Sequence, residues 1–327
     1  MGAERSSAPT IIKMEANMFR YIAKRLLMLI VVILGVSFLI YFTVDLAPGD
    51  VANSILGDDA TDEDYYALRE SLGLDDPVVI RYGRYMLNLL KGDIGYSYKY
   101  KMNVWDLYKE RFSSTVVLAI AAIVVAHLIS IPLGIYAALK RGSIEDNIAS
   151  GFSMFGLAAP NFWVGLMLII LFSLKLKWFN SGGYASLKDL VLPAITVGTE
   201  LCALLTRTTR SSMIDVLSQD YLMLARAKGV PEKRVITRHA LKNALIPIIT
   251  ISGLQFTACL GGAVLTETVF SWPGVGRLIV DSIKSGDFET VTGSIIMTSI
   301  VSSVVLLLVD ILYAFVDPRI KAQYSKG

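Results

Sequence analysis

The chain has 327 residues, of which 54% are hydrophobic and 18% are charged, and its formal net charge is +3. The charged share lies below the quarter usual in soluble domains, the mean hydropathy is +0.56, and the apolar residues form long blocks that a soluble core does not need. This composition indicates an integral membrane protein, and two cysteines and two histidines argue against a disulfide framework and a histidine-based metal or nucleophile site.

Six segments are long and apolar enough to form transmembrane helices, each of which needs about 20 mostly apolar residues. They lie at residues 26–44, 112–139, 148–174, 190–206, 243–266 and 291–316. The second segment contains His127 and Pro132, the third contains Pro160, and the fourth contains Glu200. The predicted fold class is therefore an all-α integral membrane protein with six transmembrane helices and a folded extracytoplasmic loop between helices 1 and 2.

The distribution of charge predicts the orientation of these helices, because basic residues gather near span ends on the cytoplasmic side. Lys24 and Arg25 precede the first span, and residues 207–242 carry eight Lys or Arg against three acids. Residues 45–111 instead carry thirteen acids against eight Lys or Arg. The expected organisation is a cytoplasmic N-terminal segment (1–21), a first transmembrane helix (22–44), an extracytoplasmic loop region (45–111), a core of five transmembrane helices (112–316) that includes the cytoplasmic loop 207–242, and a cytoplasmic C-terminal tail (317–327).

The loop at 45–111 has the pattern of an ordered region. Apolar residues recur at helical spacings between residues 65 and 74 and again between residues 80 and 90. The acids at 58–64 are typical of a helix start, and Gly73 is typical of a helix end. Two interpretations stay open: a small cap over the helical bundle, or a docking surface for a delivery protein.

The cytoplasmic loop contains a polar, basic interruption at residues 220–247. Residues 220–228 can form a short helix, Gly229 suits the left-handed position that ends it, and Pro231 can open the next helix. The second run has an apolar stripe of Val235, Ile236 and Ala240 and a basic face of Arg234, Arg238 and Lys242. The positive charges either set topology and attract anionic lipid, or accompany a docking site for a protein.

Several motifs give the chain a family resemblance. The runs ARAKG (225–229) and HALKNALIP (239–247) resemble the ATPase-contacting loop of ABC importer permeases, and more narrowly the B-type membrane subunit of the peptide and nickel branch. Other motifs follow in family order: APGD (47–50), GDIG (92–95) with Ser97, PNFW (160–163), LPA (192–194), FSWPGVGRL (270–278), and DILY (310–313) with DPR (317–319). The general importer motif begins with Glu-Ala-Ala, whereas Met223, Leu224 and Ala225 stand here, so no Glu function is assigned to Met223.

The resemblance implies a type I ABC importer permease architecture and a set of functional residues. The implied ATPase-coupling residues are Tyr221, Leu224, Ala225, Arg226, Ala227, Lys228 and Gly229, and His239, Asn243 and Pro247 are implied to support them. No nucleotide-binding GxxxxGK[ST] loop occurs, so ATP and Mg are expected on partner ATPase subunits, with no catalytic or metal site in this chain.

The resemblance also implies partners, a location and a substrate class. The partners are a second homologous permease subunit, two cytoplasmic ABC ATPases, an extracytoplasmic substrate-binding protein and the lipid bilayer, without nucleic acid. The expected location is the prokaryotic cell membrane. Dipeptides or oligopeptides are the expected substrates, and nickel or a nickel chelate is the alternative.

Glu200 is an ionisable residue deep inside a predicted span, and such residues usually mark pathways or buried partners. It either faces the translocation pathway and meets a cationic group, such as a peptide amine or a metal ion, or it has a structural partner. His127 and Pro132 are interpreted as packing and kink features, and Asp310 as structural.

Two other protein classes fit less well. A secondary transporter often shows repeat-related halves, and the sequence has no convincing internal repeat. A membrane enzyme would need a catalytic constellation near the spans, and the two separated histidines, without a Ser/Lys or paired-carboxylate cluster, do not supply one.

Overall fold

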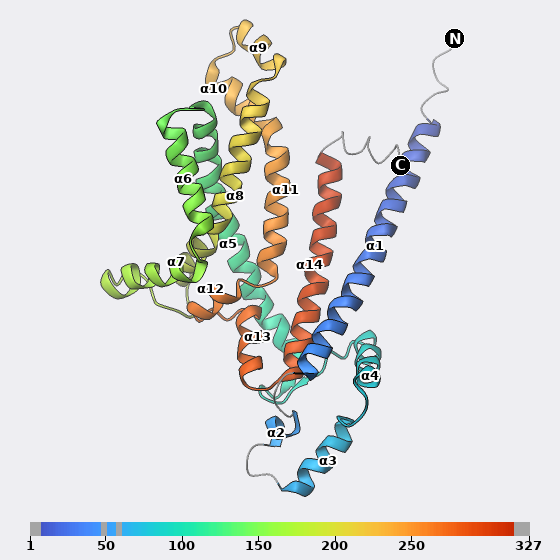
Figure 1. Ribbon diagram of the computed structural model, residues 1–327. Coiled ribbons are helices and arrows are strands. Elements are labelled where there is room, and N and C mark those ends of the chain that lie inside the picture. Colours follow the sequence, from blue (N-terminus) through green and yellow to red (C-terminus); the bar gives the residue numbers. More distant parts are fainter. Residues whose placement is uncertain (1–7, 47–50, 57–60, 317–327) are drawn as a thin grey trace.

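The computed structural model describes residues 8–46, 51–56 and 61–316, which are mostly helical. The main helices run alongside one another in a bundle (Figure 1). They are α1 (Ala8–Asp45), α5 (Val104–Leu139), α6 (Ile144–Ala158), α8 (Val191–Leu217), α11 (Leu241–Leu260) and α14 (Phe288–Val316). The APGD motif at 47–50 and the DPR motif at 317–319 lie outside the described residues.

Shorter elements occupy the two ends of the bundle (Figure 1). One end, the α9 end, carries α9 (Asp220–Ala227), α10 (Glu232–Arg234) and the π-helical turn η3 (Val235–Ala240). The other, the α3 end, carries α2 (Val51–Leu56), α3 (Asp62–Leu72), α4 (Val78–Leu90), the antiparallel strands β1 (Tyr96–Ser97) and β2 (Met102–Asn103), α12 (Val264–Val269) and α13 (Val275–Lys284). Three further elements lie between α6 and α8 along the chain: α7 (Asn161–Leu168), the π-helical η1 (Ile169–Lys175) and the 3-10 turn η2 (Leu187–Leu190).

Among the described residues, five helices are long and apolar enough to cross a membrane, or six if a bent pair counts as one span. The bent pair covers the third predicted span, 148–174, which is broken rather than straight. The chain turns by 99° between α6 and the α7–η1 segment. Pro160 explains the break, because a proline disfavours helical backbone in the residue before it, and Ala159 is extended with ψ 125°.

Other span boundaries also differ from the apolar blocks. The second span begins at Val104 rather than at residue 112, and the fourth continues past residue 206 to Leu217. Charged side chains do not stop a helix, so α8 carries Arg207 and Arg210 in its last turns. The fifth ends at Leu260, where Gly262 takes a left-handed φ of 97°.

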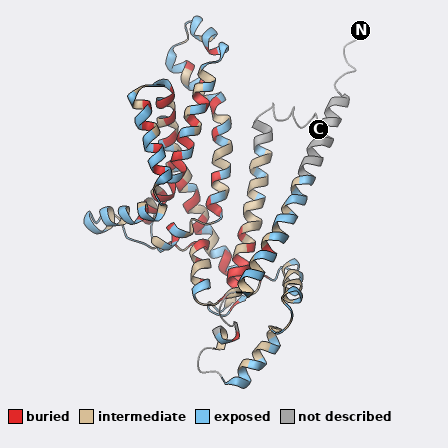
Figure 2. Cartoon of the chain, in the orientation of Figure 1, coloured by how far each residue is buried: buried red, intermediate tan, exposed pale blue. Residues whose placement is uncertain are grey.

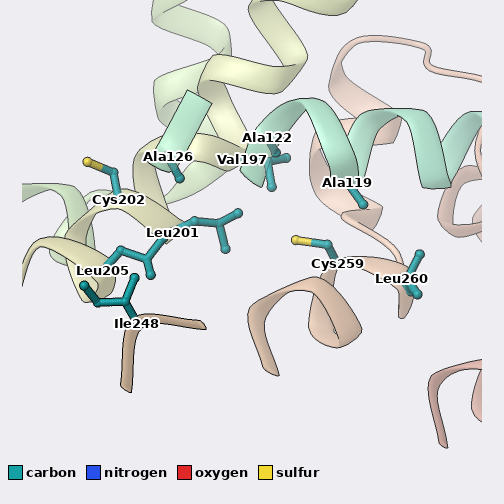
Figure 3. Close-up of a cluster of buried hydrophobic side chains, with 10 residues drawn as sticks. All are labelled: Ala119, Ala122, Ala126, Val197, Leu201, Cys202, Leu205, Ile248, Cys259 and Leu260. Carbon is teal, nitrogen blue, oxygen red and sulfur yellow. The ribbon is translucent and has the colours of Figure 1, made fainter. Parts of the chain in front are cut away.

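Helix α8 is the central element of the bundle. Its apolar window is 67% buried, whereas the windows of the four other single-helix spans are between 6% and 28% buried. Figure 2 shows buried residues concentrated where α5 and α8 meet. A cluster joins these helices to α11 (Figure 3), and its buried members are Ala119, Ala122, Ala126, Val197, Leu201, Cys202, Leu205, Ile248, Cys259 and Leu260.

Polar side chains add cross-links between the helices. The His127 Nε2 atom of α5 lies 2.7 Å from the Ser252 hydroxyl of α11, and its Nδ1 atom lies 2.7 Å from the Ile123 carbonyl oxygen. This bridge agrees with the packing role predicted for His127. Asp310 of α14 pairs with Arg25 of α1 at 2.9 Å, which agrees with its predicted structural role.

The α3 helix has the boundaries that its sequence predicts. The Thr61 hydroxyl accepts the backbone N–H of Asp64, which caps the start of the helix. Gly73 ends it with a left-handed φ of 63°, and its N–H donates back to the Glu70 carbonyl. The described residues between 45 and 111 therefore carry ordered secondary structure, as the sequence predicts.

A buried carboxylate fixes the turn between α12 and α13. Glu267 is fully buried, accepts a hydrogen bond from the Thr115 hydroxyl of α5 at 2.9 Å, and accepts the backbone N–H of Arg277 at 3.0 Å. A Cβ atom at Gly274 would lie 2.3 Å from the Glu267 carboxyl carbon, and one at Gly276 would lie 2.9 Å from its Oε2. Both glycines of the PGVG run therefore make room for this carboxylate.

The burial of Glu267 makes the contribution of this residue to folding stability decrease as pH rises. Burial raises the pKa of Glu267 above its ordinary value of 4.5. The protonated group therefore contributes stability that is complete below pH 4.5 and is lost as pH rises through the folded-state pKa. We therefore compare the Tm of the wild type with that of Glu267→Gln. The difference, wild type minus variant, should decrease as pH rises above 4.5. Thermal unfolding of purified protein measures this difference. The matched control is Glu110→Gln, whose side chain is 64% exposed; equal pH slopes for the two variants would contradict the burial effect.

Candidate functional site

The candidate site is the α9–α10–η3 segment between α8 and α11 (Figure 1). Helix α9 begins at Asp220, an acid that suits the positive end of the helix dipole. Gly229 ends it with a left-handed φ of 77°, and its N–H donates to the Arg226 carbonyl at 2.9 Å. Pro231 then precedes α10. The predicted order of helix, glycine break and second helix is confirmed.

One buried leucine anchors α9 to the bundle. Leu222 is fully buried in a cluster built from α5, α8, α9, η3 and α11. The other buried members are Ala138, Met213, Val235, Ala240 and Ala244, with Ala225 and Ile236 packed against them. The predicted apolar stripe of the second run therefore faces the interior, and α9 is seated on the ends of α5 and α8.

Around that anchor, α9 presents large apolar side chains to the outside. The exposed fractions are 42% for Tyr221, 61% for Met223 and 57% for Leu224. Ala227 and Lys228 are exposed beside them. Grouped apolar exposure on a protein surface is typical of an interaction site. The family motif assigns no role to Met223, whose exposure is visible only in the structure.

A hydrogen-bond group joins α9 to the start of α11. The Asn243 Nδ2 atom donates to the Tyr221 hydroxyl at 2.7 Å and to the His239 carbonyl at 3.1 Å. The structure thus brings together three of the residues that the resemblance implied. Pro247 lies four positions after Asn243, inside α11.

An ion pair closes the turn that follows α9. The Arg226 Nη2 atom lies 2.9 Å from Glu232 Oε1, across the Gly229 break. Both side chains are partly exposed, so solvent screens the pair and it contributes little to stability. Sequence reasoning missed Glu232, although its six-residue spacing from Arg226 across a predicted break was visible.

The basic face of the second run lies on the surface. Arg234, Arg238 and Lys242 are exposed, while Val235 and Ala240 are buried. The intervening η3 turn is π-helical, a rare conformation that is frequent at functional sites. The positive charges are therefore presented beside the exposed face of α9.

Glu200 lies apart from this segment, on α8 near the break between α6 and α7. Its carboxylate accepts a hydrogen bond from the side-chain amide of Asn161, the first residue of α7. Glu200 itself is exposed in the isolated chain. Sequence reasoning missed Asn161 as the partner, since the two residues are far apart along the chain.

Another acid, Asp146 of α6, binds α8. Asp146 is buried and receives two hydrogen bonds from Arg210, at 2.5 Å from Nε and 2.7 Å from Nη2. This bidentate geometry fixes the α6–α8 pair near the α9 end. No signal in the sequence identified the pair.

Within the described part of the chain, no group of three or more His, Cys, Asp or Glu side chains is arranged to hold a metal ion. The chemistry of the α9 segment is that of a contact surface. It offers apolar side chains, a basic flank and a buried anchor.

Neighbouring residues of α9 provide a matched test of the anchor. We expect Leu222→Ala to loosen α9, because removing a buried leucine side chain costs about 2–5 kcal/mol. Met223→Ala, at a 61% exposed position, should leave it in place. Hydrogen exchange of the amides in α9 measures the difference. Equal exchange in the two variants would show that Leu222 does not hold the helix.

Comparison with known proteins identifies the family. Residues 130–322 match the family described as binding-protein-dependent transport system inner membrane component, and residues 18–119 match the N-terminal family of such membrane components. The dipeptide transport system permease protein DppB of Escherichia coli is 37% identical over an alignment of 336 positions, gaps included, that spans 93% of this chain and 99% of that protein. The glutathione transport system permease protein GsiC of Salmonella paratyphi A is 38% identical over 304 residues, with the same shares covered.

A solved structure shows the same fold. The chain resembles a chain of the MetNI methionine ABC transporter in an inward-facing conformation, with a TM-score of 0.56 and 13% identity. The match covers 64% of this chain and 96% of that one. The α9 segment therefore lies in a multi-pass inner-membrane protein, and the chain belongs to the family of binding-protein-dependent transport permeases, the membrane subunits of ABC importers.

Proposed function

We propose that this chain forms half of the translocation pathway of an ATP-driven peptide importer and that α9 is its coupling helix. The observation that carries this proposal is the exposed apolar face of α9, which is held in place by the buried side chain of Leu222. An exposed face on a firmly seated short helix suits transmission of force from a docked protein. The coupling residues are Tyr221, Leu224, Ala225, Arg226, Ala227, Lys228 and Gly229.

The proposed orientation places both termini and the loop 207–242 in the cytoplasm. The excess of basic residues in that loop and the excess of acids in residues 45–111 support it. The exposed face of α9 then meets cytoplasmic proteins, and residues 45–111 meet the extracytoplasmic side.

The proposed complex contains a second, homologous permease, two cytoplasmic ATPases and an extracytoplasmic substrate-binding protein. ATP and Mg bind to the ATPases, so this chain contributes no catalytic residue. Dipeptides or oligopeptides are the proposed substrates. The names of the relatives support this choice, because they specify dipeptides and glutathione, which is itself a tripeptide.

The contacts of α9 suggest how movement passes into the membrane. Closure of the ATPases displaces the exposed face of α9. The Leu222 cluster carries that displacement to α5 and α8, and the hydrogen bond between Asn243 and Tyr221 carries it to α11. His239 and Pro247 support this junction from either side of Asn243.

Gly229 gives a direct test of coupling. A Cβ at this position meets no atom within 4 Å, so a substitution acts through the backbone alone. A β-branched residue in left-handed backbone costs about 1–2 kcal/mol or more. We expect Gly229→Val to reduce uptake by about tenfold while ATPase subunits still co-purify and hydrolyse ATP.

Gly229→Asn is the matched control, because asparagine tolerates positive φ. It should retain most of the uptake in proteoliposomes containing the complex. Wild-type uptake by Gly229→Val would contradict the proposed role of this helix end.

Glu200 is proposed to line the pathway and meet the amino group of a peptide. We expect Glu200→Gln to weaken uptake of peptides with a free amino terminus by about tenfold, because a hydrogen bond to a charged group contributes about 1.5–3 kcal/mol. N-acetylated peptides should be transported equally by both proteins if they are accepted. The measurement is the KM for each peptide pair, with the Tm as a check on folding. Unchanged uptake of every substrate would leave Glu200 with only its structural contact to Asn161.

A further inference from the structure

Helix α4 has two chemically distinct faces. Its exposed apolar residues are Val79, Ile80, Leu87 and Leu90, whose exposed fractions are 68%, 54%, 61% and 81%. The helical period places them on one side, together with Gly83. This face contains no charged residue, although it belongs to a region rich in acids.

The opposite face of α4 is basic and faces α3 and the ends of α1 and α14. Arg81, Arg84 and Asn88 line a cavity of about 470 Å³ between α4, α3 and the ends of α1 and α14. Arg81 pairs with Asp45 at 2.5 Å, and Arg84 pairs with Asp76 at 2.6 Å. The charges of α4 are therefore satisfied on the side away from its apolar face.

Contacts with α1 fix the depth of α4. The Tyr82 hydroxyl lies 2.9 Å from the buried Ser37 hydroxyl of α1 and donates to the Leu34 carbonyl at 3.3 Å. Both α1 residues lie inside the candidate membrane span Ala23–Asp45. Ser37 precedes Asp45 by eight positions, a rise of about 12 Å at 1.5 Å per residue. Because Arg81 reaches Asp45 at the end of the span, α4 covers the last two turns of α1.

Aromatic rings gather at the same depth. Tyr82 packs edge-on against Phe38 at 5.5 Å and against Tyr41 at 5.8 Å, and Tyr41 contacts Tyr85 at 5.5 Å. Tyrosines are typical of the boundary between headgroups and acyl chains. The α1 helix beside them has an apolar window that is only 6% buried, so α1 as well as α4 exposes apolar side chains in this chain.

We infer that α4 is a membrane-surface helix whose apolar face is inserted in the lipid leaflet at the α3 end of the bundle. Its composition is that of an interfacial helix, with Leu, Ile and Val on one side and Arg on the other. The depth of α4 along α1 also fits, because the apolar face of an interfacial helix is buried about 5–10 Å into the boundary between headgroups and acyl chains. The occupant of this face is lipid, since the helix is attached at the depth of the leaflet to a span that is itself lipid-exposed.

This assignment gives the α3–α4 region a mechanical role. The Arg84–Asp76 pair joins α4 to the end of the connection from α3, and Arg81–Asp45 joins α4 to α1. These ion pairs and the lipid contact of α4 together fix the position of the α3–α4 region relative to the membrane surface. The inference concerns lipid contact and does not depend on the coupling role of α9.

Site-directed spin labelling of the assembled transport complex in nanodiscs of phosphatidylethanolamine and phosphatidylglycerol tests the inference. Labels are placed at Leu87→Cys and Leu90→Cys, with Tyr66→Cys on α3 as the control, since Tyr66 is 67% exposed and closely matches Leu87. Both native cysteines are buried, and the unsubstituted protein measures their background labelling. Collision rates with oxygen, which partitions into lipid, and with a water-soluble nickel chelate are compared at each position.

We expect the oxygen-to-nickel collision ratio at positions 87 and 90 to be severalfold higher than at position 66. A ratio equal to that of the control at both positions would place α4 in water and overturn the inference. Shielding of both labels from both reagents would show a protein covering the face and would also overturn it. The Tm of each labelled complex, compared with that of the unlabelled complex, verifies that the fold is kept.

Discussion

The close packing of α8 against α5 is the constraint on which the rest of the structure depends. In a membrane, apolar burial between helices gains little over contact with lipid, so helices associate through small residues that allow close approach. A Cβ atom at Gly134 of α5 would lie 2.6 Å from the Thr209 Cβ atom of α8, and one at Gly198 of α8 would lie 3.1 Å from the Ala122 carbonyl oxygen. Larger residues at these positions would separate the two helices. The central position of α8, with most of its apolar window buried, follows from this contact.

The position of α8 links the two proposed functional regions. Its middle carries Glu200, which contacts the start of α7, and its last turns carry Arg210, which binds Asp146 of α6. Its end leads into α9, whose Leu222 is buried in the same cluster as Met213 of α8. Because α8 is continuous through Leu217, the proposed displacement at α9 would act along one unbroken helix. The long basic end of α8, which hydropathy assigned to a loop, is therefore part of the proposed transmission.

Local signals in the sequence predicted the local features well. Gly73 and Gly229 both end helices in left-handed backbone, as their positions after periodic segments indicated. The break at Pro160 was visible, but a proline does not by itself specify a 99° turn, because transmembrane helices often continue through prolines. Pro132 shows this within α5, which is unbroken. The different outcomes depend on tertiary packing that one sequence does not display.

The sequence also did not show which α9 side chains are buried and which are exposed. Four consecutive large residues, from Tyr221 to Leu224, surround an eight-residue helix on all sides, so periodicity does not distinguish the buried Leu222 from the exposed Met223. Long-range partners share this limit: Asn161 for Glu200, and Thr115 for Glu267.

The two acids bind different kinds of donor. The Glu267 carboxylate accepts the Arg277 N–H in the first turn of α13, one of the backbone donors that a helix start leaves without an intrahelical partner. The Glu200 carboxylate lies within the continuous helix α8 and accepts a side-chain amide, that of Asn161 at the start of α7. In both cases the donor comes from another helix, so an acid in or beside an apolar segment does not by itself show which group it binds.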